Sequence, residues 1–166
     1  MCILETHSVE VSEKVKGLVR MVQVAPSLTI IDLTIRGLPA GTYHATVRQA
    51  GDISNGAVST GSIWRDPNEN SLQARGDWGV VEVNEGGKGS AFFEKKIEVW
   101  EIIGRGMVVA REKGEKGFES NGAEGDILVG VVARSAGVWD NGKTVCSCSG
   151  KTLWEERKDE VQKGML

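Results

Sequence analysis

The chain has 166 residues, of which 40% are hydrophobic and 26% are charged, and its formal net charge at pH 7 is −3. This size and composition fit one globular domain with a sizeable core and a short appendage at either end. The mild acidity, without a basic stripe, argues against a nucleic-acid partner, and no apolar run approaches the ~20 residues of a membrane-spanning helix. The opening residues carry no secretory signal, so we expect a reducing compartment.

Strand patterns dominate the first 135 residues. Alternating or β-branched runs bounded by Gly, Asp, Asn or Pro occur at 15–24, 28–37, 41–51, 77–99, 104–113 and 125–135. Within 77–99, the stretch NEGGKG predicts a hairpin turn, because glycine adopts positive φ without a Cβ clash. Short, regularly spaced strands in a chain with 22 glycines predict an all-β sandwich or barrel.

Two stretches lack this pattern and are predicted to be long loops, at 51–77 and 112–126. A polar loop of more than about twenty residues in a compact domain is usually functional or faces a partner. After Asp140 the sequence resembles a turn-rich linker and then a charged, helix-like segment. Residues 137–144, GVWDNGKT, match a phosphate-binding loop. We reject nucleotide binding because VCSCSG follows where that loop needs a helix.

The chain has three cysteines and two histidines, too few for a disulfide framework and poorly spaced for a closed zinc site. Two of the cysteines, Cys146 and Cys148, are one residue apart. In an extended segment their side chains point to the same side, with the Cα atoms ~6.6 Å apart. Two thiolates suit Cu(I), and the same pair can react with a partner disulfide. The alternative left open is a pair of small residues without a role.

The run RSAGVWDNGKTVCSCSGKTLWEERK, residues 134–158, resembles the C-terminal segment of the copper chaperones for copper-zinc superoxide dismutase, of fungal type. Residues 17–135 resemble the dismutase-like domain of the same family, with GLPAGTYHATVRQAGD, GDWGVVEV, IIGRGMVVAREK and VGVVARSAG in the family's order. The resemblance implies an eight-stranded antiparallel Greek-key barrel. It divides the chain into a linker remnant (1–14), the barrel (15–136) and a C-terminal C-x-C segment (137–166).

The same resemblance implies that the barrel is not a dismutase. Thr46, Arg48 and Ala110 stand where a dismutase has copper-binding histidines, and Asp77 is the only ligand position that matches. We therefore expect no zinc or copper in the barrel. Other dismutase positions are also replaced, namely the zinc loop by the stretch around Ile63, Trp64 and Ala74, the substrate-guiding arginine by Asp126, and the two disulfide cysteines by Ala57 and Val129.

By resemblance, such a barrel pairs with a dismutase subunit as a heterodimer, and a homodimer is the alternative assembly. Cys146 and Cys148 would then deliver Cu(I), held transiently, or exchange disulfides with the client. An inert tail on a pure docking module is the competing interpretation. The expected location is the cytoplasm, with the mitochondrial intermembrane space as a second compartment. The family's N-terminal copper-capturing domain, with its M-x-C-x-x-C loop, has no counterpart in this sequence, so we interpret the chain as a fragment or a shortened form.

The expected interface uses three segments of the barrel and one tryptophan of the tail. We expect one of the two isoleucines in the IIGR turn to lie in the core, and its arginine to bond either the partner or carbonyls of the long loop. The expected interface residues are Gly51, Asp52, Ile53, Ser54, Ile102, Ile103, Gly104, Arg105, Val131, Val132, Ala133, Arg134 and Trp139.

Overall fold

The computed structural model describes residues 1–6, 15–67, 73–118 and 126–135. The chain divides into two compact units, Met1–Ala133 and Arg134–Leu166. Of the second unit only Arg134 and Ser135 belong to the described residues. The predictions for Trp139, Cys146 and Cys148 therefore lie outside them.

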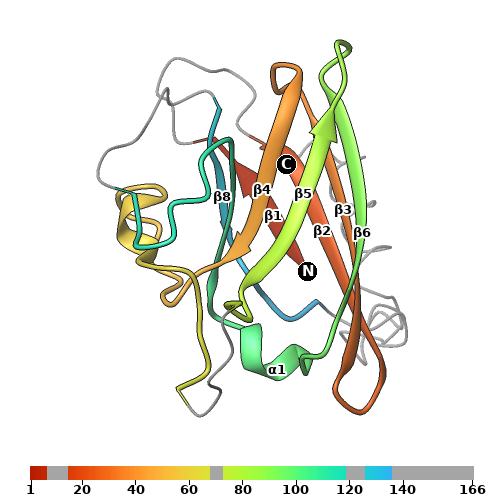
Figure 1. Ribbon diagram of the computed structural model, residues 1–166, viewed down its shortest axis with the longest axis vertical. Coiled ribbons are helices and arrows are strands. Elements are labelled where there is room, and N and C mark those ends of the chain that lie inside the picture. Colours follow the sequence, from red (N-terminus) through yellow and green to blue (C-terminus); the bar gives the residue numbers. More distant parts are fainter. Residues whose placement is uncertain (7–14, 68–72, 119–125, 136–166) are drawn as a thin grey trace, which may run out of the picture. The chain divides into compact units, whose positions relative to one another are not determined.

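The first unit is a closed antiparallel barrel of eight strands (Figure 1). Around the barrel the strands follow the order β1-β2-β3-β6-β5-β4-β7-β8, so the chain crosses over between β3 and β4 and between β6 and β7. This confirms the predicted fold class. The strands are β1 (Cys2–Glu5), β2 (Val15–Ala25), β3 (Leu28–Arg36), β4 (Gly41–Val47), β5 (Asp77–Val83), β6 (Lys88–Lys95), β7 (Gly106–Ala110) and β8 (Leu128–Val131).

Helical structure in the described part is limited to one short 3-10 helix, Val58–Thr60, and one turn of α-helix, α1 (Val99–Ile102). No helix among the described residues has the length and apolar character needed to cross a membrane. Glu98 and Glu101 form a capping box at the start of α1, each side chain accepting a bond from the other's backbone N–H. This cap fixes the start of α1, and α1 ends at Ile102, the first residue of the IIGR turn.

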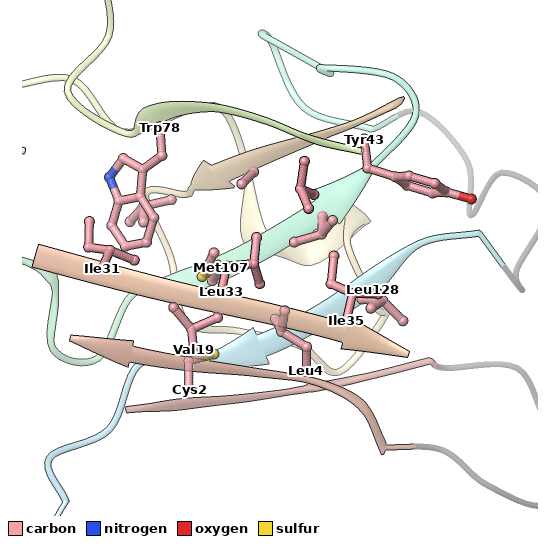
Figure 2. Close-up of a cluster of buried hydrophobic side chains, with 14 of the residues drawn as sticks. Cys2, Leu4, Val19, Ile31, Leu33, Ile35, Tyr43, Trp78, Met107 and Leu128 are labelled. Carbon is pink, nitrogen blue, oxygen red and sulfur yellow. The ribbon is translucent and has the colours of Figure 1, made fainter. Parts of the chain in front are cut away.

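Buried and outward-facing side chains alternate along the strands that form the barrel wall. On β3, Thr29, Ile31, Leu33 and Ile35 are fully buried, and the residues between them face outward. Figure 2 shows side chains from several strands pointing into one interior, with Met107 of β7 and Leu128 of β8 among them, and Ala91 and Phe93 of β6 pack against the same cluster. Burying each aliphatic side chain stabilises the fold by ~1.5–3 kcal/mol, so a strand with this pattern is strongly held in register.

The predicted hairpin turn lies between β5 and β6. The Asn84 N–H donates to the Lys88 carbonyl at 3.0 Å, and the Gly87 N–H donates to the Asn84 carbonyl at 2.9 Å. Gly87 has φ of +69°, a conformation that costs a side-chain-bearing residue about 1 kcal/mol. The hairpin prediction is confirmed, and the run 77–99 divides into β5, β6 and the first residue of α1.

The expectation of a linker at residues 1–14 is wrong for residues 2–5. These form β1, which closes the barrel between β2 and β8. Cys2 and Leu4 point inward and are 1% and 0% exposed. A Cβ on Gly130 would lie 2.0 Å from the Ile3 carbonyl oxygen, so β8 needs glycine where β1 passes. Burial raises the pKa of the Cys2 thiol to about 12, and this thiol is therefore protonated at neutral pH and unsuited to holding copper.

Candidate docking face and metal-ligand positions

Three segments far apart in the sequence meet at one place on the barrel. A Cβ on Gly51 would lie 2.1 Å from the carbonyl oxygen of Gly104 and 3.3 Å from a methyl carbon of Val131. The Gly104 N–H donates to the Val132 carbonyl at 2.8 Å, and the Val132 N–H donates to the Arg105 carbonyl at 2.9 Å. The start of the long loop, the IIGR turn and the end of β8 thus form one continuous surface, which the sequence had suggested only by resemblance.

Two of the expected interface side chains do not reach this surface. Ile102 is 0% exposed and Val132 is 1% exposed, and both belong to the barrel core. Ile102 ends α1 with its side chain inward, which leaves Ile103 outside at 38% exposure. Val132 points inward because side chains alternate along an extended chain, and only its neighbours Val131 and Ala133 face outward. The expectation that one of the two isoleucines is core is therefore confirmed.

The surface also extends onto β1, which the sequence analysis missed. Met1 and Ala133 exchange two backbone hydrogen bonds, each of 2.9 Å. The pairing of Glu5 with Val129 follows the same antiparallel register, which places Ile3 opposite Val131. Met1 is 41% exposed and Ile3 is 47% exposed. We call the following set, all from the first unit, the docking face: Met1, Ile3, Gly51, Asp52, Ser54, Ile103, Gly104, Val131 and Ala133.

Ile53, also expected at the interface, is half-buried and packs on a small apolar cluster outside the barrel core. That cluster contains Ala57 and Val129, the two positions that the resemblance places opposite the dismutase cysteines. Apolar packing therefore holds the long loop to β8 where a dismutase would use a covalent bond. Ile53 serves this packing more than any contact with a partner.

A cleft of about 500 Å³ adjoins the docking face beside α1. Trp100, on α1, is 69% exposed at this cleft, and its indole N–H donates to the Glu98 carboxylate. The sequence analysis missed Trp100 because a lone aromatic residue just after a strand shows no periodic signal. Its position two residues before Ile102, the first isoleucine of the IIGR turn, is the signal that could have indicated a place beside the docking face. The cleft is lined by Gln49, Trp64, Asp66, Pro67, Trp100, Glu101, Ile103, Gly104 and Arg105.

The Arg105 side chain joins α1 to the segment that follows β4. Its Nε donates to the Glu101 carbonyl at 2.8 Å and its Nη1 donates to the Gln49 carbonyl at 3.0 Å. The guanidinium also lies 4.6 Å from the centre of the Trp64 ring, close enough for cation–π attraction. Of the two expected roles for Arg105, bonding within the fold is the one that these contacts support.

At the metal-ligand positions the side chains cannot coordinate an ion. Thr46 donates its hydroxyl to the Val108 carbonyl at 3.2 Å, and Ala110, which pairs with His44, is 2% exposed and apolar. Asp77 already pairs with the Lys113 ammonium at 2.8 Å. Within the described ranges, no three His, Cys, Asp or Glu side chains are grouped so that they could hold a metal ion.

Arg48 brings a fixed positive charge to the same region. It is fully buried, and its Nη1 and Nη2 donate to the carbonyls of Gly114 at 2.5 Å and Lys113 at 2.7 Å. The Phe118 ring centre lies 4.7 Å from the guanidinium. Burial lowers the pKa of Arg48 to about 10, so the group stays charged at neutral pH. A cation at a ligand position repels a metal ion, and the copper and zinc of the dismutases therefore do not fit this barrel.

Comparison with known proteins identifies the family. Residues 15–132 match the family model described as copper/zinc superoxide dismutase (SODC). The chain is 40% identical over 148 residues to the Superoxide dismutase 1 copper chaperone of Saccharomyces cerevisiae, covering 89% of this chain. It is 36% identical over 179 residues to the protein of the same name from Debaryomyces hansenii, covering 99% of this chain and 68% of that protein. The chain belongs to the copper chaperones for superoxide dismutase.

More distant similarities agree with this. The human Copper chaperone for superoxide dismutase is 34% identical over 157 residues, covering 86% of this chain and 57% of that protein. A crystal structure of the clock protein EA4 matches with a TM-score of 0.60 and 24% identity, over 78% of this chain and 91% of that one, which supports the fold alone. The chain spans 58% of the length of the Saccharomyces cerevisiae chaperone. The fungal and human relatives are named as copper chaperones and not as dismutases.

We predict that the barrel of this chaperone-family chain binds no stoichiometric metal ion. The only matching carboxylate, Asp77, is paired with Lys113, and Arg48 is a cation at a former ligand position. The measurement is elemental analysis of protein that carries Cys146→Ser and Cys148→Ser, purified with added zinc and copper. Tight binding of one zinc per chain would overturn the prediction.

Proposed function

We propose that this chain docks on a subunit of copper-zinc superoxide dismutase through the docking face, and that Cys146 and Cys148 then deliver Cu(I) or form the client's disulfide. The observation that carries the docking step is the convergence of Ile103, Val131 and Ile3 around two glycines on a barrel of dismutase fold. The names of the relatives support the choice of client, since each refers to superoxide dismutase.

The composition of the docking face suits a protein interface. Gly104 has no atom within 4 Å of where a Cβ would stand, so its backbone lies open to a partner, whereas Gly51 lets the Gly104 carbonyl pack closely against it. Exposed Ile103, Ile3 and Met1 provide apolar area, while exposed Asp52 adds a charge. A stable interface of standard size buries about 800 Å² on each partner, with an apolar centre and a polar rim. The exposed apolar side chains of this face support the proposal that it binds a protein partner.

The proposed delivery step uses the chemistry of two neighbouring thiols. Two thiolates bind Cu(I) in a near-linear geometry, and the ion can pass to the client by stepwise ligand replacement. For disulfide formation, a client thiolate attacks one sulfur of an oxidised Cys146–Cys148 pair and the other sulfur leaves as a thiolate. A second client thiolate then attacks the mixed disulfide. The client loses two electrons, the pair gains two, and one oxidised chain oxidises one client.

A pure docking module is the second candidate, and one observation favours it. The docking face is built from the barrel alone, so association does not require the tail. Under this alternative the heterodimer forms, but no copper or disulfide is transferred.

One experiment separates these functions. The full chain, loaded with Cu(I), is mixed with metal-poor, disulfide-reduced dismutase, and both heterodimer formation and superoxide dismutation are measured. The control receives the same amount of Cu(I) without the chain. Association with activation above the control supports the proposal, and association without activation supports the docking module. Absence of association would show that both assignments are wrong.

A further inference from the structure

Arg48 is a buried cation, and among the described residues no buried carboxylate pairs with it. Its side chain is completely enclosed, and the described residues give it two backbone carbonyls and one aromatic ring but no carboxylate. Among the described residues its Nε–H has no hydrogen-bond partner. Burying such a group costs free energy, so the contacts that it makes have to offset that cost.

The two hydrogen bonds and the ring contact of the Arg48 guanidinium are made with one segment. Lys113, Gly114 and Phe118 belong to the connection that follows β7, which we call the clamp loop and define as residues 111–118. The planar guanidinium has a fork of donors that reaches two carbonyls at once, and its face stacks on the ring. Arg48 itself lies just after β4 and forms an isolated bridge with Ile63. It therefore fixes the clamp loop against the end of β4.

Further bonds fasten the clamp loop to other elements. Lys113 pairs with Asp77 on β5 at 2.8 Å, and the Ile63 N–H donates to the Glu115 carbonyl at 3.2 Å. Arg111 pairs with Asp126 at 3.1 Å. The loop is thus tied to β5, to the long loop and to Asp126, two residues before β8.

We propose that Arg48 is a built-in substitute for a metal ion, and that its guanidinium holds the clamp loop on the barrel where a metal-binding relative would use coordinated histidines. The metal-ligand positions do not fit an ion, whereas the guanidinium supplies a positive charge with several directed bonds. In consequence, the barrel is ordered without any metal, and this chain can dock before any copper is handled. The proposal does not depend on the identity of the client.

The test is limited proteolysis of the full chain with trypsin, whose rate of cleavage after Lys113 and Lys116 should rise when the clamp loop opens. Cleavage at these bonds in the wild type should be unchanged by a chelator or by added zinc or copper. Arg48→Met keeps a long side chain but removes both carbonyl bonds, and we expect cleavage there to rise at least tenfold. Arg48→Lys should be intermediate, because one ammonium cannot copy the fork. Arg36→Met, on the exposed end of β3, is the matched control.

Circular dichroism and the Tm of each variant establish that the barrel remains folded. If Arg48→Met fails to fold, Phe118→Leu is measured instead, because it removes only the stacked ring and should still raise cleavage severalfold. Unchanged cleavage in a folded Arg48→Met or Phe118→Leu variant would overturn the proposal. Increased cleavage of the wild-type clamp loop in the presence of a chelator would also overturn the proposal. A metal ion would then be holding the loop on the barrel in place of Arg48.

Discussion

Replacing Ile103 by glutamate is expected to abolish association of this chain with a dismutase subunit, together with any self-association. Ile103 is 38% exposed next to Gly104, near the middle of the docking face, and its neighbour Ile102 is fully buried. A carboxylate forced into an apolar interface without a partner costs several kcal/mol, which weakens binding by a hundredfold or more. Sedimentation velocity of the variant mixed with a monomeric dismutase measures the effect.

Gly104→Arg tests the same place in a different way. No atom lies within 4 Å of the position of its Cβ, so the new side chain would project into the partner and not into the barrel. Its φ of +82° adds local strain, which makes Ile103→Glu the cleaner variant. Phe92→Glu is the matched control, because Phe92 is 73% exposed on β6, on the opposite side of the barrel from β8 in strand order. Normal heterodimer in a folded Ile103→Glu variant would mean that the docking face is wrongly placed.

Either Cys146→Ser or Cys148→Ser is expected to remove at least nine-tenths of client activation while leaving association intact. Both Cu(I) coordination by two sulfurs and disulfide exchange need the complete pair, so one serine should be as damaging as two. These residues lie outside the described part of the chain, and the prediction rests on their spacing in the sequence. The measurement is dismutase activity recovered from metal-poor, disulfide-reduced client, beside sedimentation of the same mixture.

The cysteine variants are compared with controls at Ser147 and Cys2. Ser147→Ala changes the residue between the pair and should retain activation. Cys2→Ser, which sequence reasoning would treat as neutral, is a poor control, because Cys2 is 1% exposed in the core and a hydroxyl there loses its hydrogen bonds with water. Any loss in that variant has to be compared with its folded fraction. A dispensable pair together with an essential Cys2 in fully folded protein would contradict the delivery assignment.

Local sequence patterns were sufficient to predict an all-β sandwich or barrel, and the family resemblance selected the eight-stranded barrel. The alternation in β3, which buries Ile31, Leu33 and Ile35, and the glycine turn between β5 and β6 are properties of short windows. The loss of metal ligands is also visible in the sequence, since Thr46 and Ala110 cannot coordinate copper whatever surrounds them. The C-x-C pair is likewise determined by spacing alone, because residues two apart in an extended segment share one side.

Only the tertiary structure decided which residues form the docking face and what Arg48 does. β1 is too short to show a periodic signal, and its role is evident only where Cys2 and Leu4 fill the seam between β2 and β8. Ile102 and Ile103 are adjacent and chemically identical, and the end of α1 determines which of them is buried. The physical reason is that alternation is a local property, whereas closure of a barrel and contacts such as that of Arg48 with the clamp loop join residues far apart in the chain.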